Sequence, residues 1–502
     1  MTRRLTAVAA AGALVAMGTG TAAAEGGGRG DPQPGAPGIG DPYYPLDGNG
    51  GYDVDHYDLD LRYDPATDVL AGTASITAHA TQDLSSLDLD LQGLEVRSVV
   101  VDGREAVWSR QGQELVVTPH HPLHEDHQFT VEVTYDGVPQ TQEDELGLSG
   151  FIHTDDGAVV AGQPHGAATW FPANDHPRDA ASLSVRVTVP EGLEGVSNGV
   201  LCGSWTHDGW TTWAWSAGEP MAPYLVTLAV GEFDLRAYEA DGLAFWDAVD
   251  PDLATFDVDP ETEGPLAGEV VDHALGRQAE IIGFLEEHFG PYPFSAAGGI
   301  VDDTEDLTFA LETQTRPIYS PFFFSDPVFG ELVVVHEYAH QWYGDSVRLD
   351  LWRDIWLNEG FAVYAEWLWL EHEGLSTPQQ EFDFLATLSD EELGPDFWQV
   401  VIGDPGPAVD QLFHPAVYSR GAMTLHALRT EVGDDAFFTI LRAWAASQAG
   451  QTATTEEFVA LAEGVSEQQL DDLFTAWLFT PGRPAGLPEQ VPAPAPEPAP
   501  AP

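Results

Sequence analysis

Two histidines four positions apart, His336 and His340, enclose an acidic residue, Glu337, in the second half of the chain. The segment 331–342 around them contains no glycine or proline, so both imidazoles are expected one turn apart on one face of a helix. Two imidazoles in this arrangement can bind a single Zn²⁺. Glu337 is then expected beside the open position of the metal, as a general base rather than a ligand.

A catalytic zinc site needs a third protein ligand and an exchangeable water. The candidate is Glu359, which follows His340 after 18 residues. This gap leaves room for the first helix to end, for a loop around 349–354, and for a second helix that returns beside the first. The pattern therefore predicts one zinc ion per chain, bound by His336, His340 and Glu359.

The second helix is expected to run to Glu373, before Gly374. Glu366 lies seven residues beyond Glu359 and therefore on the same helical face. It could orient a histidine ligand through a hydrogen bond, or it could be a charge exposed to solvent. The sequence leaves both readings open.

The elements that would position this site change character along the chain. Between about 43 and 233, apolar and polar residues alternate, most clearly in 57–63, 87–91, 129–135 and 183–189. An alternation of period two, bounded by Gly and Asp turns, predicts half-buried strands in antiparallel sheets.

Helical spacing of apolar residues replaces this alternation from about residue 265. One helix is expected over 270–285, ending before Gly290. Capping boxes, in which a hydroxyl residue precedes Glu or Gln by three positions, predict two further helices. The two pairs are Thr454 with Glu457 and Ser466 with Gln469. The sequence thus predicts an α+β fold, a β domain followed by a mainly helical domain.

Both ends of the chain differ from the rest in composition. Residues 1–24 combine two arginines, an uncharged Ala-rich stretch and three small residues, which is typical of a cleaved export signal. The apolar run is too short to span a bilayer, which takes about 20 residues. Residues 25–42 are predicted to be a flexible leader, and 484–502, which end in an Ala-Pro repeat, a disordered tail. We therefore expect a secreted protein without a membrane segment in its mature form.

The charge of the chain is strongly negative. The sequence holds 82 acidic residues against 18 Arg and no Lys, a formal net charge of −64. Such a surface repels nucleic acid and anionic membranes. We hypothesise adaptation to high salt, which screens self-repulsion; a GC-rich genome would explain the missing Lys but not the excess of acids. The single cysteine, Cys202, excludes an intrachain disulfide and is expected to be a small buried residue.

Several stretches together resemble a known family. They are 336–345 (His-Glu-Tyr-Ala-His-Gln-Trp-Tyr-Gly-Asp), 352–362 (Trp-Arg-Asp-Ile-Trp-Leu-Asn-Glu-Gly-Phe-Ala), 289–294 (Phe-Gly-Pro-Tyr-Pro-Phe), and Gln163 with 170–177. The sequence is similar to the zinc aminopeptidases that include aminopeptidase N and leukotriene A hydrolase, over roughly 43–483. The resemblance implies an N-terminal antiparallel β saddle domain (43–233) and a thermolysin-like catalytic domain (234–483), in a short form without the C-terminal helical domain of many members.

The resemblance also implies further site residues. Family members bind the free α-amine of the substrate through a Gly-Ala-Met-Glu-Asn segment, and the matching segment 309–313 reads Phe-Ala-Leu-Glu-Thr. Glu312 keeps the acidic position, although the Gly, Met and Asn are replaced. Gln163 matches a family residue at the same end of the substrate. Tyr418, shortly before Gly421, matches the tyrosine that stabilises the oxyanion.

Taken together, the sequence predicts a secreted, monomeric zinc aminopeptidase that acts on peptides with a free N-terminus. Glu337 and Tyr418 would be catalytic, and Glu312 and Gln163 would bind substrate. Two alternatives stay open: a thermolysin-like zinc endopeptidase, and a non-catalytic binding protein with a structural zinc. Epoxide hydrolysis, as in leukotriene A hydrolase, is conceivable. The side-chain preference at the first substrate position is not predicted.

Overall fold

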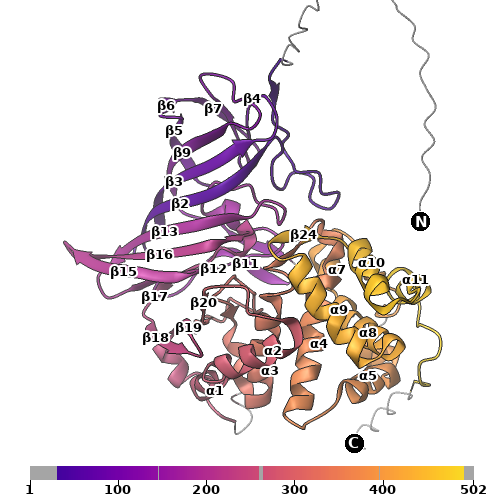
Figure 1. Cartoon of the computed structure of the whole chain (residues 1–502). Coiled ribbons are helices and arrows are strands. Elements are labelled where there is room, and N and C mark those ends of the chain that lie inside the picture. Colours follow the sequence, from indigo (N-terminus) through magenta and orange to yellow (C-terminus); the bar gives the residue numbers. More distant parts are fainter. Residues whose placement is uncertain (1–30, 145, 259, 261–263, 395, 491–502) are drawn as a thin grey trace, which may run out of the picture. The chain divides into compact units, whose positions relative to one another are not determined.

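The alternating segments of the N-terminal half form a large sheet, drawn from indigo to magenta in Figure 1. The computed structural model describes residues 31–144, 146–258, 260, 264–394 and 396–490, and the expected signal peptide and most of the expected tail lie outside them. The eight strands lie in the order β15-β16-β13-β2-β3-β9-β5-β6. Their bounds are β2 Tyr52–Asp64, β3 Val69–Ala80, β5 Glu95–Val101, β6 Arg104–Glu105, β9 Gln128–Gly137, β13 Ala181–Pro190, β15 Val200–His207 and β16 Trp210–Met221.

The predicted alternation is confirmed in β2, β9 and β13, where the apolar positions are buried. Most neighbouring strands are antiparallel, as expected, but β13 pairs with β2 in parallel, with Leu183 opposite Tyr57. Parallel neighbours need a long crossover connection, and here the chain between them forms β3, β5, β6 and β9. The expectation of purely antiparallel sheets is therefore wrong at this pair, because the alternation does not encode strand order.

Smaller sheets complete this half. A five-stranded sheet has the order β10-β11-β12-β17-β14, and two pairs, β1 with β4 and β7 with β8, stand apart from it. The bounds are β1 Gln33–Pro34, β4 Leu84–Ser86, β7 Val107–Gln111, β8 Glu114–Thr118, β10 Thr141–Asp144, β11 Gly147–His153, β12 Ala158–Ala161, β14 Glu194–Ser197 and β17 Leu228–Gly231.

Three expectations for this half are wrong. The leucines of 87–91 are fully buried, but the segment forms only isolated bridges, so its alternation marked burial rather than a regular strand. The described part of the expected flexible leader is held in place, since Asp41 is 1% exposed and accepts a hydrogen bond from the Trp352 backbone N–H. Cys202 is exposed, on the strand that ends the large sheet.

The second half opens with a sheet of five short or medium strands. They are β18 Asp234–Ala240, β19 Leu243–Val249, β20 Ala296–Ala297, β21 Ile300–Val301 and β22 Ile318–Tyr319. Two helices follow β19, α1 Ala267–Leu275 and α2 Gln278–Phe289. The single helix expected over 270–285 is thus divided, because the chain turns at Gly276 and Arg277. The expected end before Gly290 is confirmed, and Gly290 has a φ of 98°, which favours glycine.

Helices dominate the rest of the chain, in orange and yellow in Figure 1. Their bounds are α3 Pro327–His340, α4 Trp356–His372, α5 Pro378–Thr387, α6 Asp390–Leu393, α7 Val409–Leu412, α8 Pro415–Val432, α9 Asp434–Ser447, α10 Thr455–Ser466 and α11 Asp471–Phe474. The parallel strands β23 Val347–Leu349 and β24 Gln451–Ala453 pair beside them. The capping box of Thr454 with Glu457 is confirmed. The one at Ser466 is wrong, because Ser466 is the last residue of α10 and its hydroxyl bonds back to the Ala462 carbonyl.

Two glycines let the central helices α4 and α8 touch. A Cβ atom built on Gly421 would lie 2.8 Å from the Gly360 Cα, and one built on Gly360 would lie 2.9 Å from the Gly421 Cα. No larger residue fits at either position without moving a helix. This close approach sets the distance between the N-terminal turns of α4 and α8.

The α+β fold predicted from the change of period is confirmed, while the domain boundaries stay predictions. Among the described residues, no helix combines the length and the apolar character needed to cross a membrane.

Candidate metal centre and active site

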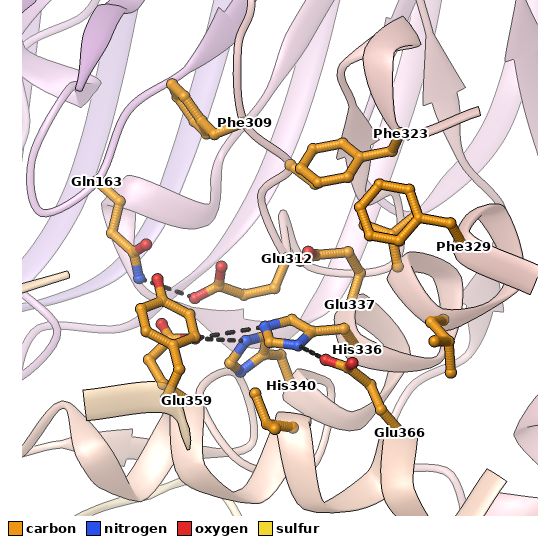
Figure 2. A pocket seen from close by; sticks show the side chains of 15 residues that line it. Gln163, Phe309, Glu312, Phe323, Phe329, His336, Glu337, His340, Glu359 and Glu366 are labelled. Carbon is orange, nitrogen blue, oxygen red and sulfur yellow. Dashed lines mark hydrogen bonds and ion pairs between the residues drawn. The ribbon is translucent and has the colours of Figure 1, made fainter. Parts of the chain in front are cut away.

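Helices α3 and α4 bring three potential metal ligands together (Figure 2). His336 and His340 lie one turn apart near the end of α3, and Glu359 lies in the first turn of α4. Their Nε2 atoms are 3.4 and 3.3 Å from Oε2 of Glu359. Tetrahedral ligands about 2.0–2.1 Å from one zinc ion are about 3.3 Å apart. The donor set, two imidazoles and a carboxylate, therefore fits zinc in both chemistry and spacing.

Hydrogen bonds fix the orientation of both histidines. Nδ1 of His336 lies 2.6 Å from Oε1 of Glu366, and Nδ1 of His340 lies 3.0 Å from the Tyr343 carbonyl oxygen. With Nδ1 donating to these oxygens, Nε2 of each ring is left as the metal-binding atom. Of the two readings that the sequence left open for Glu366, the structure supports contact with a ligand.

The pKa values of the three ligands indicate that the site favours a bound cation. Burial lowers the pKa of His340, but Glu359 and Glu312 outweigh it and raise that pKa to about 9. Burial alone would raise the pKa of Glu359, yet the two imidazoles hold it at about 2. The cluster thus strongly favours a bound positive charge, and a divalent metal ion supplies one without requiring protonated histidines.

Glu337 lies in the same pocket but outside this ligand set. Its side chain is buried, and one oxygen each of Glu337 and Glu312 lies within 4.8 Å of the other and of a ring nitrogen of His340. Burial raises the pKa of Glu337 to about 8, against the lowering effect of His336 and His340. The carboxylate therefore lies next to the metal ligands, in surroundings that favour its protonated form.

Glu312 is held by the β-rich half of the chain. Its Oε1 accepts hydrogen bonds from Nε2 of Gln163 and from the hydroxyl of Tyr224, both at 3.0 Å. Gln163 follows β12, and Tyr224 lies in a 3₁₀ turn, η2 Pro223–Leu225. The sequence did not single out Tyr224, because it belongs to no motif and its contact with Glu312 is purely spatial.

Tyr418 approaches from α8. Its ring stacks on that of His336, with centroids 6.1 Å apart and planes inclined by 23°. Tyr418 lies three residues before Gly421, so the contact between α4 and α8 brings its hydroxyl-bearing ring to the metal ligands. All seven predicted ligand, catalytic and substrate-binding residues, and Glu366 as well, line one cavity of about 270 Å³.

The cavity has a charged floor and an apolar wall. The residues that line it include four carboxylates (Glu312, Glu337, Glu359, Glu366) and no Arg. Opposite them in Figure 2, apolar side chains form the wall, among them Phe309, Phe323 and Phe329. The arrangement suits a ligand that is cationic at one end and apolar beside it.

Comparisons with known proteins agree with this geometry. Residues 53–225 match the model of the peptidase M1 N-terminal domain, and 329–477 match that of the peptidase family M1 domain. Curated relatives include aminopeptidase M1 of Arabidopsis thaliana (24% identical; 85% of this chain, 50% of that protein) and glutamyl aminopeptidase of Sus scrofa (23%; 86% and 47%). The chain spans about half the length of these relatives.

Solved structures match the whole length of their chains. The M1 zinc metallopeptidase of Deinococcus radiodurans is 30% identical, with a TM-score of 0.79 over 91% of this chain and 100% of that one. A mutant of that enzyme bound to a Tyr-Ser-Ala substrate is 29% identical, with a TM-score of 0.78 over 90% of this chain and 100% of that one. The family of these enzymes implies a zinc ion, which the donor set described above fits. By both domain models and by this likeness, the chain belongs to peptidase family M1.

Proposed function

We propose that the chain is a zinc-dependent aminopeptidase that hydrolyses the first peptide bond of peptides with a free N-terminus. The observation that carries this proposal is the position of Glu312, a buried carboxylate beside the metal ligands. An ammonium group paired with this carboxylate would hold the first residue of a peptide at the metal, which is the requirement for an exopeptidase.

His336, His340 and Glu359 would hold the zinc ion. When bound, zinc acidifies a water molecule and polarises a carbonyl group. Glu337 accepts the proton of the attacking water and passes it to the leaving nitrogen, as a general base and then a general acid. The hydroxyl of Tyr418 donates a hydrogen bond to the oxyanion of the tetrahedral intermediate. Glu312 and Gln163 bind the α-ammonium.

The charge of the cavity supports this orientation of the substrate. Its carboxylates attract an ammonium group, and none of the described residues that line it is an Arg that could form a bidentate pair with a substrate carboxylate. The Tyr-Ser-Ala complex of the Deinococcus radiodurans relative supports a peptide as the substrate class.

One pair of reporters tests the proposal. Zinc-loaded protein should hydrolyse an aminoacyl fluorogenic amide and should fail on the same compound with an N-acetyl group, because acetylation removes the positive charge that Glu312 binds. A chelator should abolish hydrolysis and added zinc should restore it. Equal cleavage of the acetylated compound would instead identify an endopeptidase, and zinc binding without hydrolysis of either would identify a non-catalytic protein.

We also propose that the chain is exported and that its mature form is a monomer. The charged, Ala-rich sequence of residues 1–24 supports export. The protein recovered from the culture medium should begin near Glu25, as determined by intact mass, and should elute as a single chain in size-exclusion chromatography. An uncleaved N-terminus in a cell-associated protein would contradict the proposal.

A further inference from the structure

Two neighbouring parallel strands of the second half are each followed directly by an aspartate. Val249, the last residue of β19, lies opposite Val301, the last residue of β21, and the Asp250 N–H continues the ladder to the Val301 carbonyl at 2.9 Å. Residues opposite each other on neighbouring strands point to the same face. Asp250 and Asp302 therefore leave the same edge of the sheet side by side.

Two more carboxylates join them, and Asp250, Asp252, Asp302 and Asp303 are called the aspartate cluster below. One carboxylate oxygen from each of Asp250, Asp252 and Asp303 lies within 4.8 Å of the other two. Oxygens that share one Ca²⁺ ion, at about 2.3–2.6 Å each, are at most about 5 Å apart. The spacing of these three oxygens is thus that of ligands around one ion.

Asp302 gives an independent indication of a missing positive charge. Its side chain is 1% exposed, and its Oδ2 atom has no hydrogen-bond partner among the described residues, while Oδ1 accepts from the Thr304 N–H at 2.9 Å. Burial raises its pKa to about 8, and the carboxylates that raise it further are those of Asp250, Asp156 and Asp303. Burial and the neighbouring carboxylates therefore disfavour a negative charge on Asp302, and a cation nearby would relieve this cost.

In the described part of the chain, the carboxylates of Asp250 and Asp302 accept hydrogen bonds from backbone N–H groups only: Asp250 Oδ1 accepts from the Asp252 N–H at 2.7 Å, and Asp302 Oδ1 from the Thr304 N–H at 2.9 Å. No Arg or His there forms an ion pair with any member of the aspartate cluster, although the same structure pairs other buried acids, such as Glu331 with Arg277. The turn between β11 and β12 adds Asp155 and Asp156, whose charges also act on the cluster. Burial, above all, raises the pKa of Asp250 to about 7.

We propose that the aspartate cluster binds one Ca²⁺ ion, at a site separate from the zinc centre. An all-oxygen, all-carboxylate donor set selects hard cations over zinc, which prefers nitrogen and sulfur ligands. Calcium tolerates irregular geometry and up to eight oxygens, whereas Mg²⁺ demands a near-ideal octahedron at a shorter distance. Asp302 lies outside the set of three closely spaced oxygens, and a bound cation would favour its ionised form.

The site would connect parts of the chain that matter for the active-site cavity. From Asp303 the chain runs within ten residues to Glu312, past Phe309 in the cavity wall. An ion at the aspartate cluster would fix the start of this segment to the end of β19. The inference rests on the cluster alone and stands whatever the substrate of the zinc centre is.

Calcium binding to the zinc-loaded full chain tests the proposal. Protein passed through calcium-depleted buffer is dialysed to equilibrium against radioactive calcium at constant ionic strength set with NaCl. We expect one equivalent of calcium per chain, retained against excess Mg²⁺, and a higher melting temperature in calcium than in NaCl alone. The Asp303→Asn variant should bind calcium about tenfold or more weakly, because it loses a charged ligand.

Asp306→Asn is the matched control, since it makes the same charge change on an exposed residue of the same loop and should bind calcium as the parent does. If Asp303→Asn loses its native circular dichroism, the exposed Asp252 provides the deciding variant, Asp252→Asn. The proposal is overturned if the parent chain retains no calcium, if both ligand variants bind it as tightly as the control, or if NaCl or Mg²⁺ displaces it at equal ionic strength.

Discussion

At the residue scale, turnover is expected to depend on Glu337 more than on any other side chain that does not bind the metal. Glu337→Gln keeps the size and shape of the side chain but removes the base, so we expect kcat to fall by about 10²–10⁴. Zinc content, measured by elemental analysis, should stay at one per chain because the ligands are untouched. Glu305→Gln, at an exposed position, is the control. Near-normal turnover in zinc-loaded Glu337→Gln would refute the assigned role.

Tyr224 is the second residue whose replacement is informative. Tyr224→Phe removes only the hydroxyl that donates to Glu312 at 3.0 Å. Hydrogen bonds to charged groups contribute about 1.5–3 kcal/mol, so we expect kcat/KM for aminoacyl substrates to fall roughly ten- to hundredfold. The loss should appear mainly in KM, because Glu312 binds the ammonium and does not react. Tyr238→Phe, on β18, should leave both constants unchanged; a loss confined to kcat would contradict the positioning role of Tyr224.

These residues differ in how far the sequence could identify them. The histidines and Glu337 share one helix, so their spacing alone predicts that they meet. Glu359, Glu312, Gln163 and Tyr418 were found by matching spaced motifs, which record contacts made by the tertiary fold. Tyr224 and the aspartate cluster lie in no motif. In a chain with 82 acidic residues, four more aspartates carry no signal until the strand ends bring them together.

At the element scale, the contact between α4 and α8 determines where Tyr418 lies. Gly421→Ala would place a Cβ atom 2.8 Å from the Gly360 Cα, so α8 must move away from α4. We expect a loss of about 1–3 kcal/mol in the free energy of unfolding and a lower kcat, because the hydroxyl of Tyr418 moves with the helix. Denaturant unfolding and steady-state kinetics measure the two effects.

Gly283→Ala provides the control for this variant. Gly283 is also inside a helix, α2, but a Cβ atom there meets no atom within 4 Å. Alanine favours helix by up to about 1 kcal/mol over glycine, so this variant should be at least as stable as the parent and fully active. Equal destabilisation of both variants would contradict this explanation, because Gly283→Ala introduces no close approach and gains helix propensity.

Element type was more predictable than element boundaries. Periodicity correctly indicated strands in the first half and helices in the second, since both depend on local burial patterns. It missed the break at Gly276 and Arg277, because apolar residues continue at helical spacing across it. It also predicted a regular strand over 87–91, where the segment forms only isolated antiparallel bridges, because alternating burial does not show whether strand pairing is continuous.

At the scale of the whole molecule, the change of period predicted two differently built halves, but not how they join. The parallel pairing of β13 with β2 and the contact of Gln163 and Tyr224 with Glu312 depend on strand order and on packing between distant segments. Of these features, the contact with Glu312 brings Gln163 to the cavity. A site formed by both halves is therefore visible in the sequence only through motifs, and its remaining contacts come from the structure.

The net charge of −64 leads to the last prediction, again for the whole molecule. With 82 acids against 18 arginines, repulsion between carboxylates outweighs attraction over the molecule as a whole and favours the expanded, unfolded chain. Salt shortens the screening length from about 10 Å at 0.1 M to about 3 Å at 1 M. We therefore expect the melting temperature to rise steeply up to about 1 M NaCl and to level off beyond it, as screening saturates.

Measurements in KCl and in sucrose separate this effect from solvent exclusion, since KCl should reproduce the curve and sucrose should not. Full stability in dilute, calcium-free buffer would contradict adaptation to high salt. A rise that depends on calcium alone would assign the effect to the aspartate cluster instead of the surface as a whole.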